Sequence, residues 1–172
     1  MTPTLICPGL EPRMLNMEFR IAGIPNDLAE EVRRTLRSPQ YGHPAHREIA
    51  TGYGPCRLCL RTFEEGVEER ILFTYQPFSD PSSVPAPGPV FIHASRCERF
   101  EDGELPPDFR ELPMFLEAYG IVGELLGRER VREQQPEVVL ERLFTELRAD
   151  YVHIRNAEAG CFMARVQRAD GP

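Results

Sequence analysis

The sequence predicts a single α+β domain that has a mainly antiparallel or mixed sheet and two helices. Its 172 residues, of which 41% are hydrophobic, suit one compact domain with a sizeable core. Several segments alternate apolar and polar residues as strands do, and two separated segments show helical spacing. We expect the globular part at residues 17–168, between a loose leader (1–16) and a tail (169–172). Met14 and Met17 are alternatives to Met1 as the start codon.

The first elements of the domain are a strand and a helix. Residues 19–24 alternate like a strand, and residues 24–36 follow with apolar residues on one helical face. Asp27 and Glu30 have the spacing of a capping box at the start of this helix. Residues 38–54 are rich in Pro, Gly and His, which predicts a loop.

The middle of the chain predicts a hairpin and a further strand. Residues 59–63 and 70–78 are expected to be strands joined by an acidic turn at 64–69. Residues 79–89 are rich in Pro and Ser, so they cannot continue a ladder. Residues 90–95, "VFIHAS", form the next expected strand.

The last third of the chain predicts strands around one clear helix. Residues 100–113 are expected to be irregular, and residues 114–127 favour a pair of strands over a short helix. Residues 136–151 carry apolar side chains at helical spacing after a proline in the first turn. Residues 151–155 and 161–168 then predict a closing hairpin.

The composition restricts the classes of function. All 20 basic residues are Arg, and the 27 acidic residues leave a net charge of -7, so we expect no nucleic-acid partner. The absence of Lys excludes Schiff-base chemistry. No apolar run approaches the roughly 18 residues of a membrane span, and the N-terminus lacks the features of a signal peptide. We therefore expect a cytoplasmic protein without a membrane partner, whose cysteines are free thiols or metal ligands.

Two short cysteine and histidine motifs predict a metal site. Cys56-x-x-Cys59 has the spacing of half a zinc site, and His93 with Cys97 supplies an imidazole and a third thiolate. Three sulfurs and one nitrogen suit Zn(II). Because four protein ligands leave no position for a catalytic water, the role of the metal would be structural. The two motifs can meet only if the strand that carries His93 lies beside the hairpin that begins at Cys59.

Two other interpretations of these residues remain open. Cys56 and Cys59 can be small buried hydrophobic residues, with His93 a core or surface histidine. A redox pair is less favoured, because such a pair normally sits at a helix N-terminus and this one leads into an expected strand.

A second group of residues has the components of a cysteine nucleophile system. His153, Asn156 and Cys161 lie on or beside one expected hairpin, and an activated thiolate needs an imidazole within hydrogen-bond reach. The simpler interpretation is that Asn156 is a turn residue and Cys161 a core residue. An enzyme of this class would use Cys56 or Cys161 as nucleophile, with a histidine as base.

Arginines near these motifs are candidates for binding an anion. Arg57 follows the first cysteine, and Arg155 lies in the closing hairpin, so their guanidinium groups could bind a carboxylate or a phosphate. The alternative is that the arginines around the cysteine motifs are solvated and pair with neighbouring glutamates. These flanking arginines are Arg57, Arg61, Arg96 and Arg99.

Four segments, in this order, resemble a bacterial family numbered 1203 among the domains of unknown function. They are "GPCRLCL", "GPVFIH" followed by Cys97, "LEAYG" and "VHIRNAEAGCF", and the resemblance covers about residues 17–168. Its Pro-Cys-Arg core corresponds to Pro55, Cys56 and Arg57, whereas the position of Cys59 can be Ser in relatives. The resemblance therefore implies no activity, and it implies that a zinc site would belong to a subgroup of the family.

Three functions remain as hypotheses from the sequence. The first is a small binding domain that holds a structural Zn(II) and binds an anionic small ligand or a protein partner. The second is an enzyme with a cysteine nucleophile, Cys56 or Cys161, and a histidine base, His93 or His153. The third is a purely structural or interaction protein whose cysteines are core residues.

Overall fold

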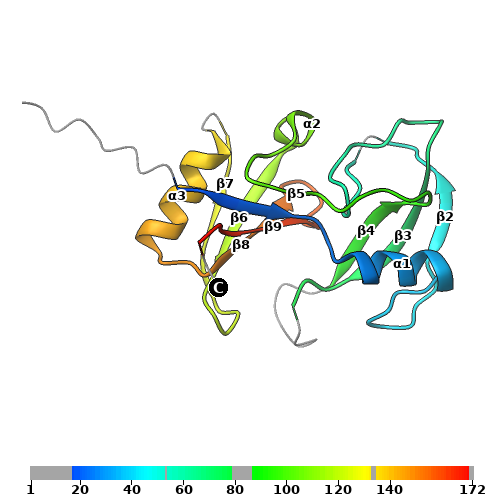
Figure 1. Ribbon diagram of the computed structural model, residues 1–172, viewed down its shortest axis with the longest axis horizontal. Coiled ribbons are helices and arrows are strands. Elements are labelled where there is room, and N and C mark those ends of the chain that lie inside the picture. The colour runs from blue at the N-terminus through cyan, green and yellow to red at the C-terminus, as the bar shows by residue number, and fades with distance from the viewer. Residues whose placement is uncertain (1–16, 53, 79–86, 133–134, 171–172) are drawn as a thin grey trace, which may run out of the picture.

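The computed structural model describes residues 17–52, 54–78, 87–132 and 135–170. Two sheets form the two halves of the molecule (Figure 1). The six-stranded sheet has the order β5 (Glu101–Asp102), β1 (Phe19–Ala22), β9 (Phe162–Arg168), β8 (Tyr151–Asn156), β6 (Met114–Tyr119) and β7 (Leu125–Arg130). The three-stranded sheet has the order β2 (His46–Ile49), β3 (Glu69–Tyr75) and β4 (Gly88–His93). The helices are α1 (Asn26–Thr35), α2 (Pro107–Arg110) and α3 (Pro136–Glu146).

All ladders between the described strands are antiparallel, which confirms the α+β class and the mainly antiparallel sheet. The two longer helices and the closing hairpin of β8 and β9 are also as predicted. No described helix is long and apolar enough to cross a membrane.

Each sheet has its own hydrophobic core. On the six-stranded sheet, Val139, Leu140 and Phe144 of α3 pack against strand residues such as Leu116 and Ile154. These helix positions recur every three to four residues, so one face of α3 is buried. The second core lies between the three-stranded sheet and α1, and it includes residues of the cysteine motif. Its members include Ala29, Val32, Cys56, Leu58, Ile71, Phe73 and Ile92.

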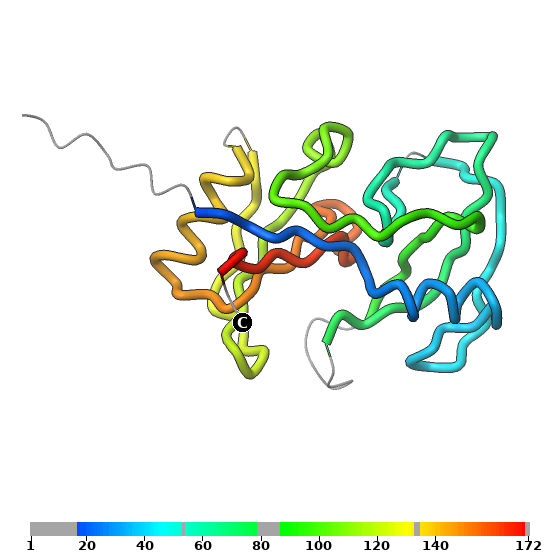
Figure 2. The backbone as a smooth tube through the Cα atoms, viewed as in Figure 1, coloured from blue at the N-terminus to red at the C-terminus, as the bar shows by residue number. Residues whose placement is uncertain are grey.

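Along the chain, the α1–β4 half is inserted between β1 and β5, so the main chain crosses between the halves at residues 22–26 and 93–101 (Figure 2). At the first crossing, Gly23 lies against the backbone of the cysteine motif. A Cβ atom at Gly23 would be 2.1 Å from Leu58 O and 2.7 Å from Arg57 O. The Gly23 amide donates to Phe100 O at 3.0 Å, which joins the two crossings. Only glycine permits this approach.

The predicted hairpin of residues 59–63 and 70–78 is wrong in its first strand. Residues 55–62 form a turn closed by one isolated bridge, Pro55 to Thr62. The partner of β3 is β2, which lies inside the segment 38–54 that was predicted to be a loop. Every side chain of β2 is exposed, so this strand has no buried face and therefore no alternating pattern to reveal it.

Two smaller expectations are also corrected. The start of α1 has no side-chain cap; Pro25 is the N-cap residue and Asp27 lies in the first turn, so the capping box is absent. A third helix, α2, occurs within the stretch 100–113 that was expected to be irregular. The expected leader at 1–16 and most of the loop at 79–89 lie outside the described residues.

Candidate metal centre

The turn that carries the first two cysteines is a compact loop. The Cys56 amide donates to Arg61 O at 2.9 Å, and the Leu60 amide donates to Cys56 O at 2.8 Å. Leu60 is in the left-handed region, with φ at 57°, which reverses the chain directly after Cys59. The turn brings the two sulfurs together. The Cys59 amide donates to Cys56 Sγ, and the Arg61 amide donates to Cys59 Sγ.

His93 and Cys97 approach this turn from β4 and from the segment after it. β4 is tied to the turn by the Arg57 amide, which donates to Phe91 O at 2.8 Å. The His93 amide donates to Cys56 Sγ at 3.4 Å. The Phe100 amide donates to Leu58 O at 2.9 Å, which holds the segment that carries Cys97 against the turn. The four candidate ligands predicted from the sequence therefore converge, with β4 docked on the cysteine turn itself.

The four ligand atoms have the spacing that a single metal ion needs. The three Sγ atoms and one ring nitrogen of His93 all lie within 4.8 Å of one another. Cys56 Sγ is 3.9 Å from Cys97 Sγ, and Cys59 Sγ is 3.4 Å from His93 Nδ1. A tetrahedral zinc with bonds of about 2.0 to 2.3 Å has edges of about 3.6 to 3.8 Å between ligand atoms. Both distances lie close to those edges.

Contacts within this cluster shift the pKa values of Cys56, Cys59 and His93. Burial alone would raise the pKa of the Cys56 thiol, but hydrogen bonds from Cys59, Cys97 and His93 outweigh it and lower that pKa. The pKa of Cys59 is raised, because its thiol donates to Cys56 and Cys97. Burial disfavours the charged imidazole of His93, but contacts with Cys56 and Cys97 raise its pKa to about 9. Cys56, Cys59 and His93 therefore compete for the same protons, which a bound dication would displace.

The outer face of His93 is held by a glutamate and an arginine. His93 is 1% exposed, and its Nε2 lies 3.5 Å from Glu68 Oε2 and 3.0 Å from an Arg61 nitrogen. Arg61 also donates to both oxygens of Glu68, at 2.6 and 3.2 Å, and holds the pKa of that carboxyl down at about 2. When Nδ1 faces a metal, Nε2 carries the proton, so the Arg61 nitrogen, which is also a donor, would have to move away and Glu68 would be the acceptor in reach.

An arginine side chain contacts the sulfur of Cys97. Arg33 of α1 donates to Cys97 Sγ at 3.4 Å and to His93 O at 3.1 Å. Three thiolates around a dication would leave one negative charge close to the Arg33 guanidinium, which also pairs with Glu30 at 3.0 Å. The sequence analysis did not select Arg33 or Glu68. Because each lies far along the chain from the residue it contacts, no local spacing signals its role.

Arg57, a predicted anion-binding residue, lies beside the cluster. It is 5% exposed, and its guanidinium donates to Phe162 O at 2.6 Å and to Pro55 O. Burial lowers its pKa to about 10. These bonds join the cysteine turn to the start of β9 on the six-stranded sheet.

Arg155, the other predicted anion-binding residue, lies on β8 and pairs across the ladder with Phe162, whose carbonyl oxygen accepts from Arg57. Arg155 Nε is 2.7 Å from Glu117 Oε2, and Arg155 Nη1 donates to Gly160 O at 2.8 Å. Glu117 also accepts from the Tyr119 hydroxyl at 2.7 Å. The buried pair fixes β8 against β6.

The side chains of the predicted nucleophile system do not hydrogen-bond to one another, although the Asn156 amide donates to Cys161 O at 2.9 Å. His153 is completely buried among aromatic rings, neither ring nitrogen has a partner among the described residues, and burial lowers its pKa. Asn156 accepts from the amides of Glu158 and Ala159 in the β8–β9 turn. Cys161 Sγ lies 3.8 Å from Ala159 O. The catalytic role stays a prediction.

Fold and site together define a small α+β protein with one buried cluster of three cysteines and a histidine. A family model described as "Protein of unknown function (DUF1203)" matches residues 53–168, and the chain belongs to this family. No curated protein and no solved structure matches the chain. The resemblance predicted from the sequence motifs is therefore confirmed.

Proposed function

We propose that this protein is a binding domain in which Cys56, Cys59, His93 and Cys97 hold one Zn(II) ion. The observation that carries the proposal is the convergence of their ligand atoms within 4.8 Å of one another. Thiolate and imidazole are ligands that zinc favours, and a Cys₃His set is one of its common structural sites.

The compactness of the cluster favours a single ion over an iron–sulfur cluster. A two-iron centre places its outer ligands farther apart, because two irons and their bridging sulfides lie between them. His93 has a carboxylate beside its outer nitrogen, as metal-bound histidines usually do.

The proposed role of the ion is to hold the α1–β4 half in place. Its ligands come from a turn, a strand and the second chain crossing, none of which belongs to the six-stranded sheet. Arg57 then connects the same turn to β9. Because four protein side chains fill a tetrahedral site, no position is left for a catalytic water.

Metal analysis of protein purified without a histidine tag tests the proposal. We expect about one equivalent of zinc in the native protein and a large loss of it in the Cys59→Ser variant. Cys161→Ser is the matched control, because Cys161 is a half-buried cysteine outside the cluster. Less than about a tenth of an equivalent of zinc, unchanged by Cys59→Ser, would overturn the proposal.

An anion or protein partner at Arg57 and Arg155 stays part of the prediction from the sequence. Both guanidinium groups are buried and already bonded within the protein. An anion at either residue would therefore have to displace a carbonyl or Glu117.

The rival function is an enzyme with a cysteine nucleophile. Its nucleophile would be Cys56, whose pKa is lowered despite burial by hydrogen bonds within the cluster but whose side chain is completely buried, or the half-buried Cys161. This function predicts a metal-free protein in which one thiol reacts rapidly with iodoacetamide at neutral pH. One slow and uniform rate of alkylation for all cysteines would exclude it.

A further inference from the structure

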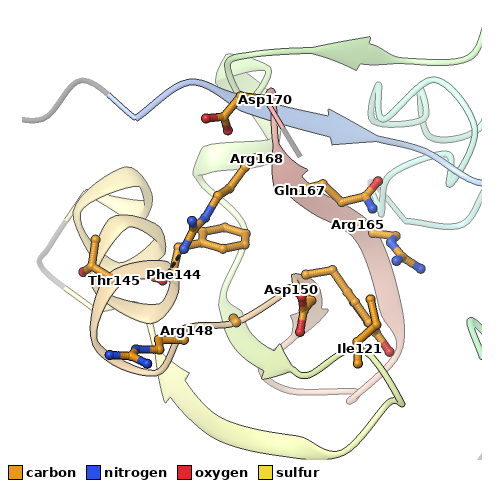
Figure 3. Close-up of a pocket in the computed structure, with 11 residues that line it drawn as sticks. Ile121, Phe144, Thr145, Arg148, Asp150, Arg165, Gln167, Arg168 and Asp170 are labelled. Atoms are coloured by element: carbon orange, nitrogen blue, oxygen red, sulfur yellow. Dashed lines mark hydrogen bonds between the residues drawn. The ribbon is translucent and has the colours of Figure 1, made fainter. Parts of the chain in front are cut away.

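A second concave site lies on the six-stranded half and shares no residue with the metal centre. A cavity of about 710 Å³ opens between the end of α3, the start of β8 and β9. In Figure 3, Arg168 extends from β9 towards Phe144 of α3, whereas Arg148 and Asp150 lie across the opening on the α3–β8 connection. Its volume is in the range of small-molecule sites.

The charges that line this cavity are not paired with one another. Three arginines, Arg148, Arg165 and Arg168, face two aspartates, so three positive charges against two negative ones leave an excess of one. No carboxylate of the described residues lies within ion-pair distance of these arginines, although many other arginines of the chain are paired. Arg168 donates only to Phe144 O, at 2.5 Å.

Of the three arginines, Arg165 gives the strongest indication that the cavity binds an anion. Its guanidinium lies 3.9 Å from the centre of the Tyr151 ring, which fixes its plane. The guanidinium donates no hydrogen bond to any described residue, and its Nε is buried without an acceptor. Burial lowers the pKa of Arg165, and Tyr151 and Tyr75 oppose that shift only in part. A partly desolvated guanidinium without an acceptor is costly, and a bound anion would remove that cost.

The remaining walls indicate what else the ligand carries. Phe144, Tyr151 and Ile121 line the same cavity, and Ile121 is 76% exposed. An inorganic anion would leave this apolar surface and most of the volume unfilled. An excess of one positive charge matches a singly charged carboxylate better than a phosphate dianion, which the two aspartates would repel.

We propose that this cavity binds a small organic carboxylate, with the carboxylate at Arg165 and an apolar body against the exposed Ile121. The proposal does not rest on the metal centre, and the zinc-loaded or metal-free full chain can be tested in the same way.

A series of three ligands with one phenyl body and different charge tests this site. Phenylacetate, 2-phenylethanol and phenethylammonium are titrated into the ¹⁵N-labelled full chain, and amide chemical shifts are followed. We expect saturable shifts with phenylacetate at residues 144–151 and 165–168, and binding at least about tenfold weaker for the other two ligands. Arg165→Gln is expected to weaken phenylacetate binding about tenfold.

Two further variants make the result unambiguous. Arg34→Gln removes the same charge from an exposed position on α1 and should leave binding unchanged. Arg148→Gln changes an exposed residue of the cavity, so it should weaken binding even if Arg165→Gln impairs folding. The proposal is overturned by equal binding of 2-phenylethanol, by preferred binding of phenethylammonium, by shifts that map elsewhere, or by no saturable shift with phenylacetate.

Discussion

Replacing Gly23 by Ala should destabilise the protein and disturb the metal centre together. The new Cβ would be 2.1 Å from Leu58 O and 2.7 Å from Arg57 O, so the backbone must separate by at least about 1.3 Å to reach ordinary van der Waals contact. Leu58 lies between two of the proposed ligands, Cys56 and Cys59. The separation would therefore move the turn that carries them.

The cost follows from the bonds at this contact. The Ile24 amide donates to Arg57 O at 2.8 Å, the Gly23 amide donates to Phe100 O at 3.0 Å, and Arg99 donates to Gly23 O at 3.1 Å. Loss of two of these bonds costs about 2 kcal/mol, and the overpacking adds about 1 to 3 kcal/mol. The expected loss of unfolding free energy is about 3 to 5 kcal/mol.

Urea unfolding followed by circular dichroism, with zinc measured on the same samples, gives both quantities. Gly88→Ala is the matched control, because no atom lies within 4 Å of a Cβ at that position; it should change the free energy by less than about 1 kcal/mol. A Gly23→Ala variant that retains wild-type zinc and lies within about 1 kcal/mol of the wild type would refute this reasoning.

Three further predictions test the cluster and the buried histidine. Glu68→Gln should weaken zinc binding about 10- to 100-fold in a chelator competition, since it removes the carboxylate beside the metal-binding imidazole; an equal effect of the exposed Glu65→Gln would contradict this. His153 is held neutral by burial, so its contribution to stability is present above its ordinary pKa of about 6.5 and is lost as the pH falls below that value. The unfolding free energy of the wild type should therefore fall more steeply from about pH 6.5 to 5.5 than that of His153→Phe, by up to about 1 kcal/mol. Parallel curves would contradict this prediction. Hydrogen peroxide should oxidise Cys56 and Cys97, whose sulfurs are 3.9 Å apart, to a disulfide, and the peroxide is reduced to two hydroxide ions. Zinc should then be released to a chromogenic chelator. Zinc that stays bound after a disulfide has been mapped between these cysteines would refute the assignment.

The sequence predicted those parts of the fold that have a buried and an exposed face. Apolar residues at a spacing of three to four gave α3, and alternation gave β3 and β4. The sequence pattern did not predict β2, because all of the side chains of this strand are exposed. Residues 59–63 were mistaken for a strand because the left-handed conformation of Leu60, a residue that rarely adopts it, has no sequence signal.

The sequence predicted the four side chains of the candidate metal site, but it predicted only in part how the fold brings them together. The residue types and local spacings selected the four side chains, and the expected proximity of His93 depended on a hairpin that does not form as predicted. In the structure, β4 reaches the cysteine turn through the Arg57 amide and Phe91 O.

By itself, the sequence determined the α+β class, the ligand chemistry of Cys56, Cys59, His93 and Cys97, and the family resemblance, because periodicity and local spacing are written in neighbouring residues. Only the tertiary structure decided that the four ligands meet, that Arg33 and Glu68 support them, and that Gly23 must have no side chain. It also decided that Arg148, Arg165 and Arg168 line one cavity. The physical reason is that such contacts join residues far apart in the chain, where no local pattern records the distance between them.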